Sequence, residues 1–397
     1  MTHQVPRGFR VSGVAAGIKR YAEREDVTLV VSDHPCTAAG VYTTNRVFAA
    51  PVALDRARTP SDQMRAVVVN SGNANACTGE QGDRDALEMT RLTAQACNVP
   101  AESVLVMSTG IIGHHLPMEK VAAGISKAAA QLGATPEHLM AAQRGIMTTD
   151  TREKMASRTL ELAGRTITIT GLAKGAGMIG PKMATLLSIV MTDARLAAAE
   201  AQQVLGRVAE ASFNSISVEG HMSTNDTLLL LASGAAGTEP LQGEQLARFE
   251  RALLEVCTDL ARAIADDGEG ATHLVEIEVV GAADDQGARR IAKTIADSPL
   301  VKCAIAGNDP NWGRIVSAAG YSGVEFDLSA TQLIVNGFCL FRAGSPVSFD
   351  AAAVSGSMRD HRETKIQLQV GSGLGHARFW TCDLTTEYVH INADYHT

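Results

Sequence analysis

Short runs of β-type residues alternate with longer stretches of helical periodicity, and this alternation limits the possible fold most. Several of the runs, 364–370 among them, alternate polar and apolar residues, which indicates a sheet with one covered face rather than a fully parallel, doubly wound sheet. The predicted strands are 27–31, 65–71, 103–109, 165–170, 185–191, 273–280, 331–338 and 364–370. The predicted helices are 83–97, 121–133, the stretch after a Thr135 cap with Pro136 in first position, 197–212 and 244–265. The sequence therefore predicts an α/β or mixed α+β fold with mixed sheets.

The composition and charge of the chain indicate which kinds of molecule it binds. The chain has 397 residues, of which 45% are hydrophobic and 20% charged, enough for one large domain or two to three smaller ones. Its formal net charge is −8 and it contains no basic run. Because a nucleic-acid-binding surface needs clustered Lys and Arg, we expect small-molecule or protein partners and no nucleic acid.

Cysteine usage and the first residues indicate the compartment. The seven cysteines are scattered and form no C-x-x-C pair, which argues against both a disulfide framework and a zinc cluster and fits a reducing compartment. The segment 1–13 lacks the apolar core of a signal peptide, and no stretch has the roughly 18 to 20 apolar residues of a membrane span. We therefore expect a cytoplasmic protein without a membrane segment.

A glycine-dense bend at 175–180 matches G-x-G-x-x-G and raises the possibility of a dinucleotide-binding turn. Such a turn needs a helix directly after the third glycine, so that free N–H groups meet the pyrophosphate. Here Pro181 is followed by an apolar, β-branched run that is typical of a buried strand. A Walker A loop also fails, because Pro181 stands between Gly180 and Lys182.

A second interpretation makes Thr185 a nucleophile. If its hydroxyl attacked the carbonyl of Ala184, the chain would be cut there, and the new α-amino group, with a pKa of about 8 in model peptides, could act as the base. Glycines permit the bend and Pro181 stiffens it. The pattern alone nevertheless favours the simpler interpretation that Thr185 begins a buried strand.

A family resemblance favours the interpretation of Thr185 as a nucleophile. The segment K-G-A-G-M-I-G-P-K-M-A-T-L-L closely resembles the self-processing segment of the ornithine acetyltransferases, also called glutamate N-acetyltransferases. The resemblance extends over nearly the whole chain and includes VVVNSGNANACTG, MSTGIIG, IMTTDTREK, SFNSISVEGHMSTNDT, ADDGEGATH, GNDPNWGRI and the terminal YVHINADYHT. So many separate matches in chain order make an accident very improbable.

The resemblance implies a self-processing enzyme. Cleavage between Ala184 and Thr185 would give an α chain 1–184 and a β chain 185–397, assembled as an α2β2 heterotetramer. The implied fold is a layered α/β sandwich like that of the N-terminal-nucleophile hydrolases. The implied reaction transfers the acetyl group of N2-acetyl-L-ornithine to L-glutamate through acetyl-Thr185, in arginine biosynthesis. No cofactor or metal is implied, and acetyl-CoA is a possible further co-substrate.

The resemblance also assigns the site residues. Thr109 and Gly110 match the oxyanion hole, although their pattern alone indicates only a turn that ends a strand. Lys174 and Glu269 would pair with a substrate carboxylate and ammonium group, whereas by pattern they read as solvated charges. The aromatic and β-type spacing of 379–391 favours a docked tail. The complete predicted substrate set is Thr151, Lys174, Thr185, Glu269, Asn392 and Thr397.

Two alternatives stay open at this point. One is a related self-processing amidohydrolase or aminopeptidase, in which water replaces glutamate as the acceptor. The other is a non-catalytic dinucleotide-binding protein that uses the glycine bend.

Overall fold

The computed structural model describes residues 3–20, 23–162, 164–180 and 186–394. They form two compact units, the first comprising Met1–Asn214 and His221–Ile264 and the second comprising Ser215–Gly220 and Ala265–His396. The units do not follow the predicted division at 184/185, which concerns a covalent cut rather than a domain boundary. Thr185, Ala184 and Thr397 lie outside the described residues.

The first unit is built on one mixed sheet with the strand order β4-β3-β2-β8-β7-β6-β5, and β1 pairs with β2. The pairs β3/β4 and β7/β8 are parallel, while β1/β2, β2/β3, β2/β8, β5/β6 and β6/β7 are antiparallel. The strands are β1 Phe9–Val14, β2 Val27–Tyr42, β3 Ser61–Asn73, β4 Val104–Ile111, β5 Lys154–Leu162, β6 Arg165–Lys174, β7 Leu187–Thr192 and β8 Thr227–Ala232. This mixed sheet confirms the predicted fold class.

The long strand β2 joins the two halves of this sheet, because its residues Val27–Ser32 pair with β1 and its residues Thr37–Tyr42 pair with β8. One apolar cluster combines inward side chains of β3 and β4, such as Val67 and Met107, with those of β7 and β8, such as Ile189 and Leu229. The two halves therefore enclose a common core, which gives the layered sandwich that was expected.

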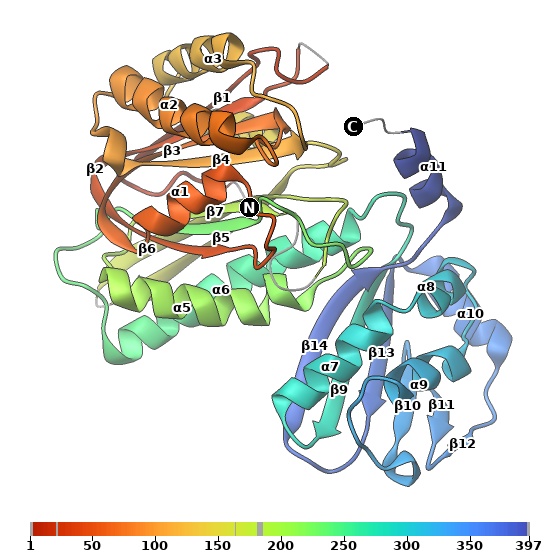
Figure 1. The fold of residues 1–397 in the computed structure, drawn as a ribbon. Coiled ribbons are helices and arrows are strands. Elements are labelled where there is room, and N and C mark those ends of the chain that lie inside the picture. Colours follow the sequence, from red (N-terminus) through yellow and green to blue (C-terminus); the bar gives the residue numbers. More distant parts are fainter. Residues whose placement is uncertain (1–2, 21–22, 163, 181–185, 395–397) are drawn as a thin grey trace. The chain divides into compact units, whose positions relative to one another are not determined.

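Helices cover both outer faces of this sandwich, as Figure 1 shows for α2 and α3 on one side and α5 and α6 on the other. Apolar residues of α2 and α3, including Met89 and Ile125, pack against the outward side chains Val68 and Val106. The helices are α1 Ala50–Arg58, α2 Gly79–Cys97, α3 Met118–Ala130, α4 Pro136–Ile146, α5 Ala198–Ala211 and α6 Gly243–Asp266. Two short 3-10 helices, Ala101–Ser103 and Phe213–Ser215, also occur. Buried on both faces, the central strands are almost continuously apolar.

The second unit has a mixed sheet with the strand order β12-β11-β10-β13-β9-β14. In β13 the residues Thr364, Ile366 and Leu368 are buried while those between them are not, so one face of the sheet is covered, as predicted. The strands are β9 Leu274–Ala282, β10 Gln332–Val335, β11 Phe338–Arg342, β12 Ser345–Pro346, β13 Glu363–Gln369 and β14 Gly375–Cys382. The helices are α7 Asp285–Ala296, α8 Pro299–Ala306, α9 Trp312–Gly320, α10 Ala351–Asp360 and α11 Thr386–Asp394, with a 3-10 helix at Leu328–Ala330.

The tail differs in part from its prediction. Residues 375–382 form β14, but 386–394 form helix α11 rather than continuing the β-type spacing. This helix has no buried residue, and a helix without a buried face shows no apolar periodicity from which it could be predicted. It still lies against its own unit, because a Cβ added to Gly270 would come within 2.5 Å of the Tyr388 nitrogen.

Candidate active site

The first part of the candidate site is the end of strand β4, where the predicted oxyanion-hole residues lie. Thr109 is buried, and it pairs with Ser71 across the parallel β3/β4 ladder. Gly110 pairs with Gly72 and has a φ of 132°, and a Cβ at Gly110 would come within 2.3 Å of the Gly72 carbonyl carbon. Only glycine fits this corner, so the two strands can approach closely while β4 ends.

Lys174 reaches the same corner from the end of β6. Its ammonium group donates a hydrogen bond of 3.3 Å to the Thr109 hydroxyl oxygen, and the lysine side chain is almost wholly buried. The sequence pattern had suggested a solvated loop charge, and the structure corrects that simpler interpretation. Because the Thr109 oxygen accepts from Lys174, its own hydroxyl hydrogen remains available for another acceptor.

A buried ion pair between Asp150, in the segment between α4 and β5, and Lys154, the first residue of β5, holds the residue that follows Lys174. Asp150 accepts from the Lys154 ammonium group at 2.6 Å and from the backbone N–H of Gly175 at 2.7 Å. Burial by itself raises the pKa of Asp150, but the charges of Lys154 and Lys174 and these hydrogen bonds outweigh it and lower the pKa to about 2. Asp150 thus stays ionised and fixes the residue that follows Lys174.

Thr151, a predicted substrate residue, directly follows Asp150 and is exposed. The loop that carries it is therefore held to the end of β6 by the contacts of its neighbour. Sequence reasoning did not single out Asp150 or Lys154, although both lie in the motif IMTTDTREK. A carboxylate and a lysine four residues apart are common on surfaces, and only burial distinguishes this pair.

Asn225 is another residue that the sequence did not single out. It is buried, and its amide nitrogen donates to the backbone oxygens of Ala74 at 2.6 Å and Ser108 at 2.9 Å. Ser108 in turn donates to Asn70 at 2.6 Å. These bonds connect the segment before β8 to the end of β4, next to Thr109. The motif SFNSISVEGHMSTNDT contained the signal, but nothing in its spacing indicated a bridge to β4.

In the second unit, the loop 267–273 brings Glu269 to the tail helix. The Asn392 amide nitrogen donates to the Glu269 carboxylate at 2.9 Å and to the Tyr388 oxygen at 3.0 Å. The structure therefore joins these two predicted substrate residues, which lie 123 positions apart in the chain. Glu269 is partly exposed, and a partly exposed carboxylate can receive a substrate ammonium group.

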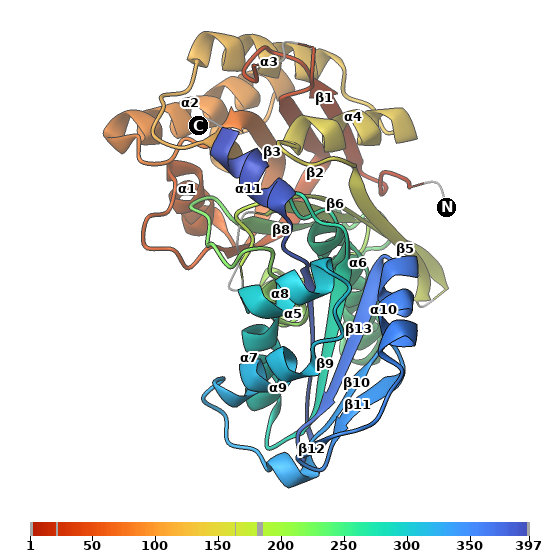
Figure 2. The same ribbon diagram turned by 90° about the vertical axis from the view of Figure 1, so that its right-hand side faces the viewer.

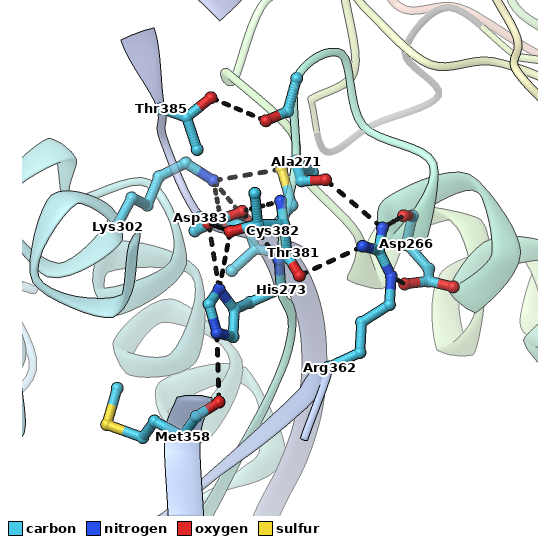
Figure 3. A network of polar contacts seen from close by, with 12 residues as sticks. Asp266, Ala271, His273, Lys302, Met358, Arg362, Thr381, Cys382, Asp383 and Thr385 are labelled. Atoms are coloured by element: carbon cyan, nitrogen blue, oxygen red, sulfur yellow. Dashed lines mark hydrogen bonds and ion pairs between the residues drawn. The ribbon is translucent and has the colours of Figure 1, made fainter. Parts of the chain in front are cut away.

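A polar network at the start of β9 and the end of β14 holds this loop in place (Figure 3). The Asp383 carboxylate accepts from the backbone N–H groups of Thr272 at 2.9 Å and His273 at 3.1 Å, and it also accepts from the Thr272 hydroxyl. The Lys302 ammonium group donates to the hydroxyl of Thr381 at 2.9 Å and to the Cys382 oxygen.

The same network couples His273 to Asp383. The hydrogen bond that the His273 ring donates to the Asp383 carboxylate raises the pKa of His273, and burial opposes this effect. At the other ring nitrogen, His273 contacts the Met358 oxygen at 3.2 Å. The loop that carries Glu269 is thus anchored at its last residues.

The glycine bend leads into a strand rather than a helix. After Gly180, the third glycine of the G-x-G-x-x-G match, the next described element is strand β7. The helix N-terminus that a dinucleotide site requires is therefore absent from the described part of this region. Within the described residues, no cluster of three or more His, Cys, Asp or Glu side chains could hold a metal ion. Among the described helices, none is long and apolar enough to cross a membrane.

Comparison with known proteins identifies the family. The model of the ArgJ family matches residues 10–397. This chain belongs to the ArgJ family. It is 48% identical to the arginine biosynthesis bifunctional protein ArgJ of Rhodopirellula baltica, over all of this chain and 97% of that protein. The ArgJ of Symbiobacterium thermophilum is also 48% identical, over 99% of this chain and 98% of that protein.

A solved structure agrees with this assignment. The crystal structure of the arginine biosynthesis bifunctional protein ArgJ from Bacillus halodurans matches with a TM-score of 0.51 and 42% identity, over 52% of this chain and 98% of that chain. The family resemblance inferred from the motifs is therefore confirmed.

Proposed function

We propose that this protein transfers the acetyl group of N2-acetyl-L-ornithine to L-glutamate in arginine biosynthesis. The observation that carries the proposal is the buried corner in which Lys174 donates to the Thr109 hydroxyl beside Gly110. Membership of the ArgJ family supports the same conclusion, since the relatives are named as bifunctional proteins of arginine biosynthesis. The amidohydrolase and dinucleotide-binding alternatives gain no support from the family.

In the proposed first half-reaction, the Thr185 hydroxyl attacks the acetyl carbonyl while the Thr185 α-amine accepts the hydroxyl proton. The C–O bond to Thr185 forms, the amide C–N bond breaks, and the same proton passes to the departing ornithine amine. The oxygen of the tetrahedral intermediate would accept from the Thr109 hydroxyl and the Gly110 N–H. Lys174, hydrogen-bonded to the Thr109 oxygen, adds positive charge at this point.

In the proposed second half-reaction, the glutamate α-amine attacks the acetyl-Thr185 ester. The ester C–O bond breaks and a new amide forms, while the Thr185 oxygen recovers a proton from the attacking amine. The same oxyanion donors serve both halves. Catalysis of this kind gives ping-pong kinetics, because ornithine leaves before glutamate reacts.

Substrate recognition follows from the charges of the two substrates. We assign the substrate α-carboxylate to Lys174. Thr151 is assigned as a further substrate contact, and it directly follows Asp150, which accepts from the Gly175 N–H. Glu269 and Asn392 are assigned to the side-chain ammonium group of ornithine, and Thr397 is assigned as a further substrate contact. Acetyl-CoA is proposed as a further acetyl donor, as the name bifunctional suggests for the relatives.

The enzyme is proposed to form by self-cleavage between Ala184 and Thr185 and to assemble as α2β2, without a cofactor or metal. A cytoplasmic location is proposed as well. Its support is that all seven cysteines are free thiols, as a reducing compartment requires. Size-exclusion chromatography with mass detection, on the cleaved protein, measures the assembly.

Incubation with N-acetylornithine, with and without glutamate, tests the proposed reaction. Transfer predicts N-acetylglutamate and ornithine in equal amounts when glutamate is present, and little acetate when it is absent. Release of acetate at the full rate without glutamate would instead establish the hydrolase alternative.

A further inference from the structure

Asp226 lies directly before strand β8, and the mechanism proposed above does not use it. One oxygen of its carboxyl group, Oδ1, accepts a hydrogen bond of 3.0 Å from the backbone N–H of Leu186. That N–H belongs to the peptide bond that follows Thr185 in the chain. Asp226 is completely buried, so this contact is shielded from water.

The backbone beside Asp226 holds the other side of Leu186. The Thr227 N–H donates to the Leu186 oxygen at 3.0 Å, and Leu187 pairs with Thr227 in the parallel β7/β8 ladder. The backbone oxygen of Asp226 accepts from the N–H of Thr43 at 2.9 Å. Both polar groups of the Leu186 backbone are therefore fixed by two consecutive residues.

The second carboxyl oxygen of Asp226, Oδ2, is fully buried and makes no hydrogen bond to any residue in the described part of the chain. Burial raises the pKa of Asp226 well above its ordinary value, against the lowering effect of the Leu186 N–H, the nearby Thr43 and Ser223 side chains and the charge of Lys174. Burial therefore disfavours the ionised form of this carboxyl group.

We propose that Asp226 is a positioning residue for the nucleophile, fixing the amide that immediately follows Thr185 during both self-cleavage and acetyl transfer. The inference rests on the proposed role of Thr185. Asp226 itself touches no reacting atom in this account.

The chain contains a matched control in Asp55 of α1. Asp55 is also completely buried, its Oδ1 accepts from the Val106 N–H at 2.8 Å, and its Oδ2 has no hydrogen bond among the described residues. Burial raises the pKa of Asp55 well above its ordinary value too. The two aspartates differ in what they hold, because Val106 lies within β4 and is not adjacent to a proposed reacting residue.

The test compares the variants D226N, D226A and D226L with D55N and D55A. Self-cleavage is followed on denaturing gels, both half-reactions give kcat and KM, and thermal unfolding reports folding. Leucine imitates the shape of the carboxyl group without accepting a hydrogen bond, so D226L remains informative if D226A does not fold. Asparagine keeps the acceptor for Leu186 but cannot ionise.

We expect D226A and D226L to lower the cleavage rate and kcat by about 100-fold with little change in KM, because a small displacement of a reacting group has effects of that order. D226N should restore most of the activity with an unchanged pH profile. D55N and D55A should lower the unfolding temperature and leave kcat near that of the wild type.

If the wild type is active, either of two results would overturn the inference. If D226A and D226L lost stability as D55A does but kept their kcat, Asp226 would be purely structural. If folded D226N were as inactive as D226L, an ionisable proton would be required instead of a positioned amide. A folded wild type that neither cleaves nor transfers acetyl groups would instead refute the proposed function.

Discussion

Asp150 and Lys154 form an ion pair of 2.6 Å in which neither side chain is exposed to solvent. The same Asp150 oxygen accepts from the N–H of Gly175, so the pair fastens the loop after α4 to the residue that follows Lys174. The ion pair therefore links the stability of the first unit to the geometry of its proposed active site.

Breaking this pair should destabilise the protein strongly. The variant D150A leaves the Lys154 charge buried without its partner, and such losses cost about 3–5 kcal/mol of unfolding free energy. Urea unfolding measures the change. The matched control is D33A, which breaks the exposed Arg10–Asp33 pair of 2.9 Å and should cost less than about 1 kcal/mol. Equal effects of the two variants would contradict the account.

The protonation of Asp150 should lower the stability of the protein in acid. The pKa of Asp150 in the folded protein is about 2, below its unfolded value of about 3.9. A depressed pKa stabilises the protein above the unfolded value, and the stabilisation disappears as the pH falls through the folded one. We expect a loss of roughly 2 kcal/mol of unfolding free energy between about pH 4 and pH 2. A matching slope in the variant D150N, measured over the same range, would show that other groups cause it.

The Thr109 hydroxyl should matter for catalysis more than for binding. The variant T109A removes the proposed oxyanion donor and is expected to lower kcat by about 100-fold with a small change in KM. T109S keeps the hydroxyl that Lys174 contacts and should recover most of the rate. Steady-state kinetics with both substrates provide the measurement. A T109A enzyme with normal kcat would exclude Thr109 from the oxyanion hole.

Glu269 should distinguish the two substrates, because only ornithine carries a side-chain ammonium group. The variant E269Q keeps the size of the side chain and removes its charge, so KM for N-acetylornithine should rise by about 10- to 100-fold, as expected for a lost charged hydrogen bond. KM for glutamate should change little. Equal increases for both substrates would indicate that Glu269 supports the loop rather than binding ornithine.

Much of the fold could be predicted from the sequence because the core strands and the helices α2 to α6 carry strong periodic signals. Thr135 and Pro136 do begin α4, but the Thr135 hydroxyl contacts His138 at 2.8 Å instead of capping the helix backbone. Helix α7 was not predicted, although Asp284 caps it through a 2.7 Å bond from the Gly287 N–H, and an aspartate is a common N-cap residue. The division into two units had no signal, because α6 runs from one unit into the other without a flexible linker.

The site was less accessible to sequence reasoning. The motifs identified Thr109 and Lys174, but their contact joins positions 65 residues apart and depends on how β4 and β6 are placed by the sheet. Asp150 and Asp226 look like ordinary polar residues, and only burial gives them their properties. Periodicity shows which side of a strand is apolar, but it cannot show which distant strand supplies a polar partner.

The central claim is that Thr185, released by self-cleavage, carries the acetyl group. Intact-mass measurement of wild type and T185A, each incubated with N-acetylornithine without glutamate, tests it most directly. The account predicts two chains in the wild type, the second beginning at Thr185 and heavier by one acetyl group, which glutamate then removes. T185A should remain one unmodified chain. A folded wild type that stays uncut, or an acetyl group found on T185A, would contradict the account.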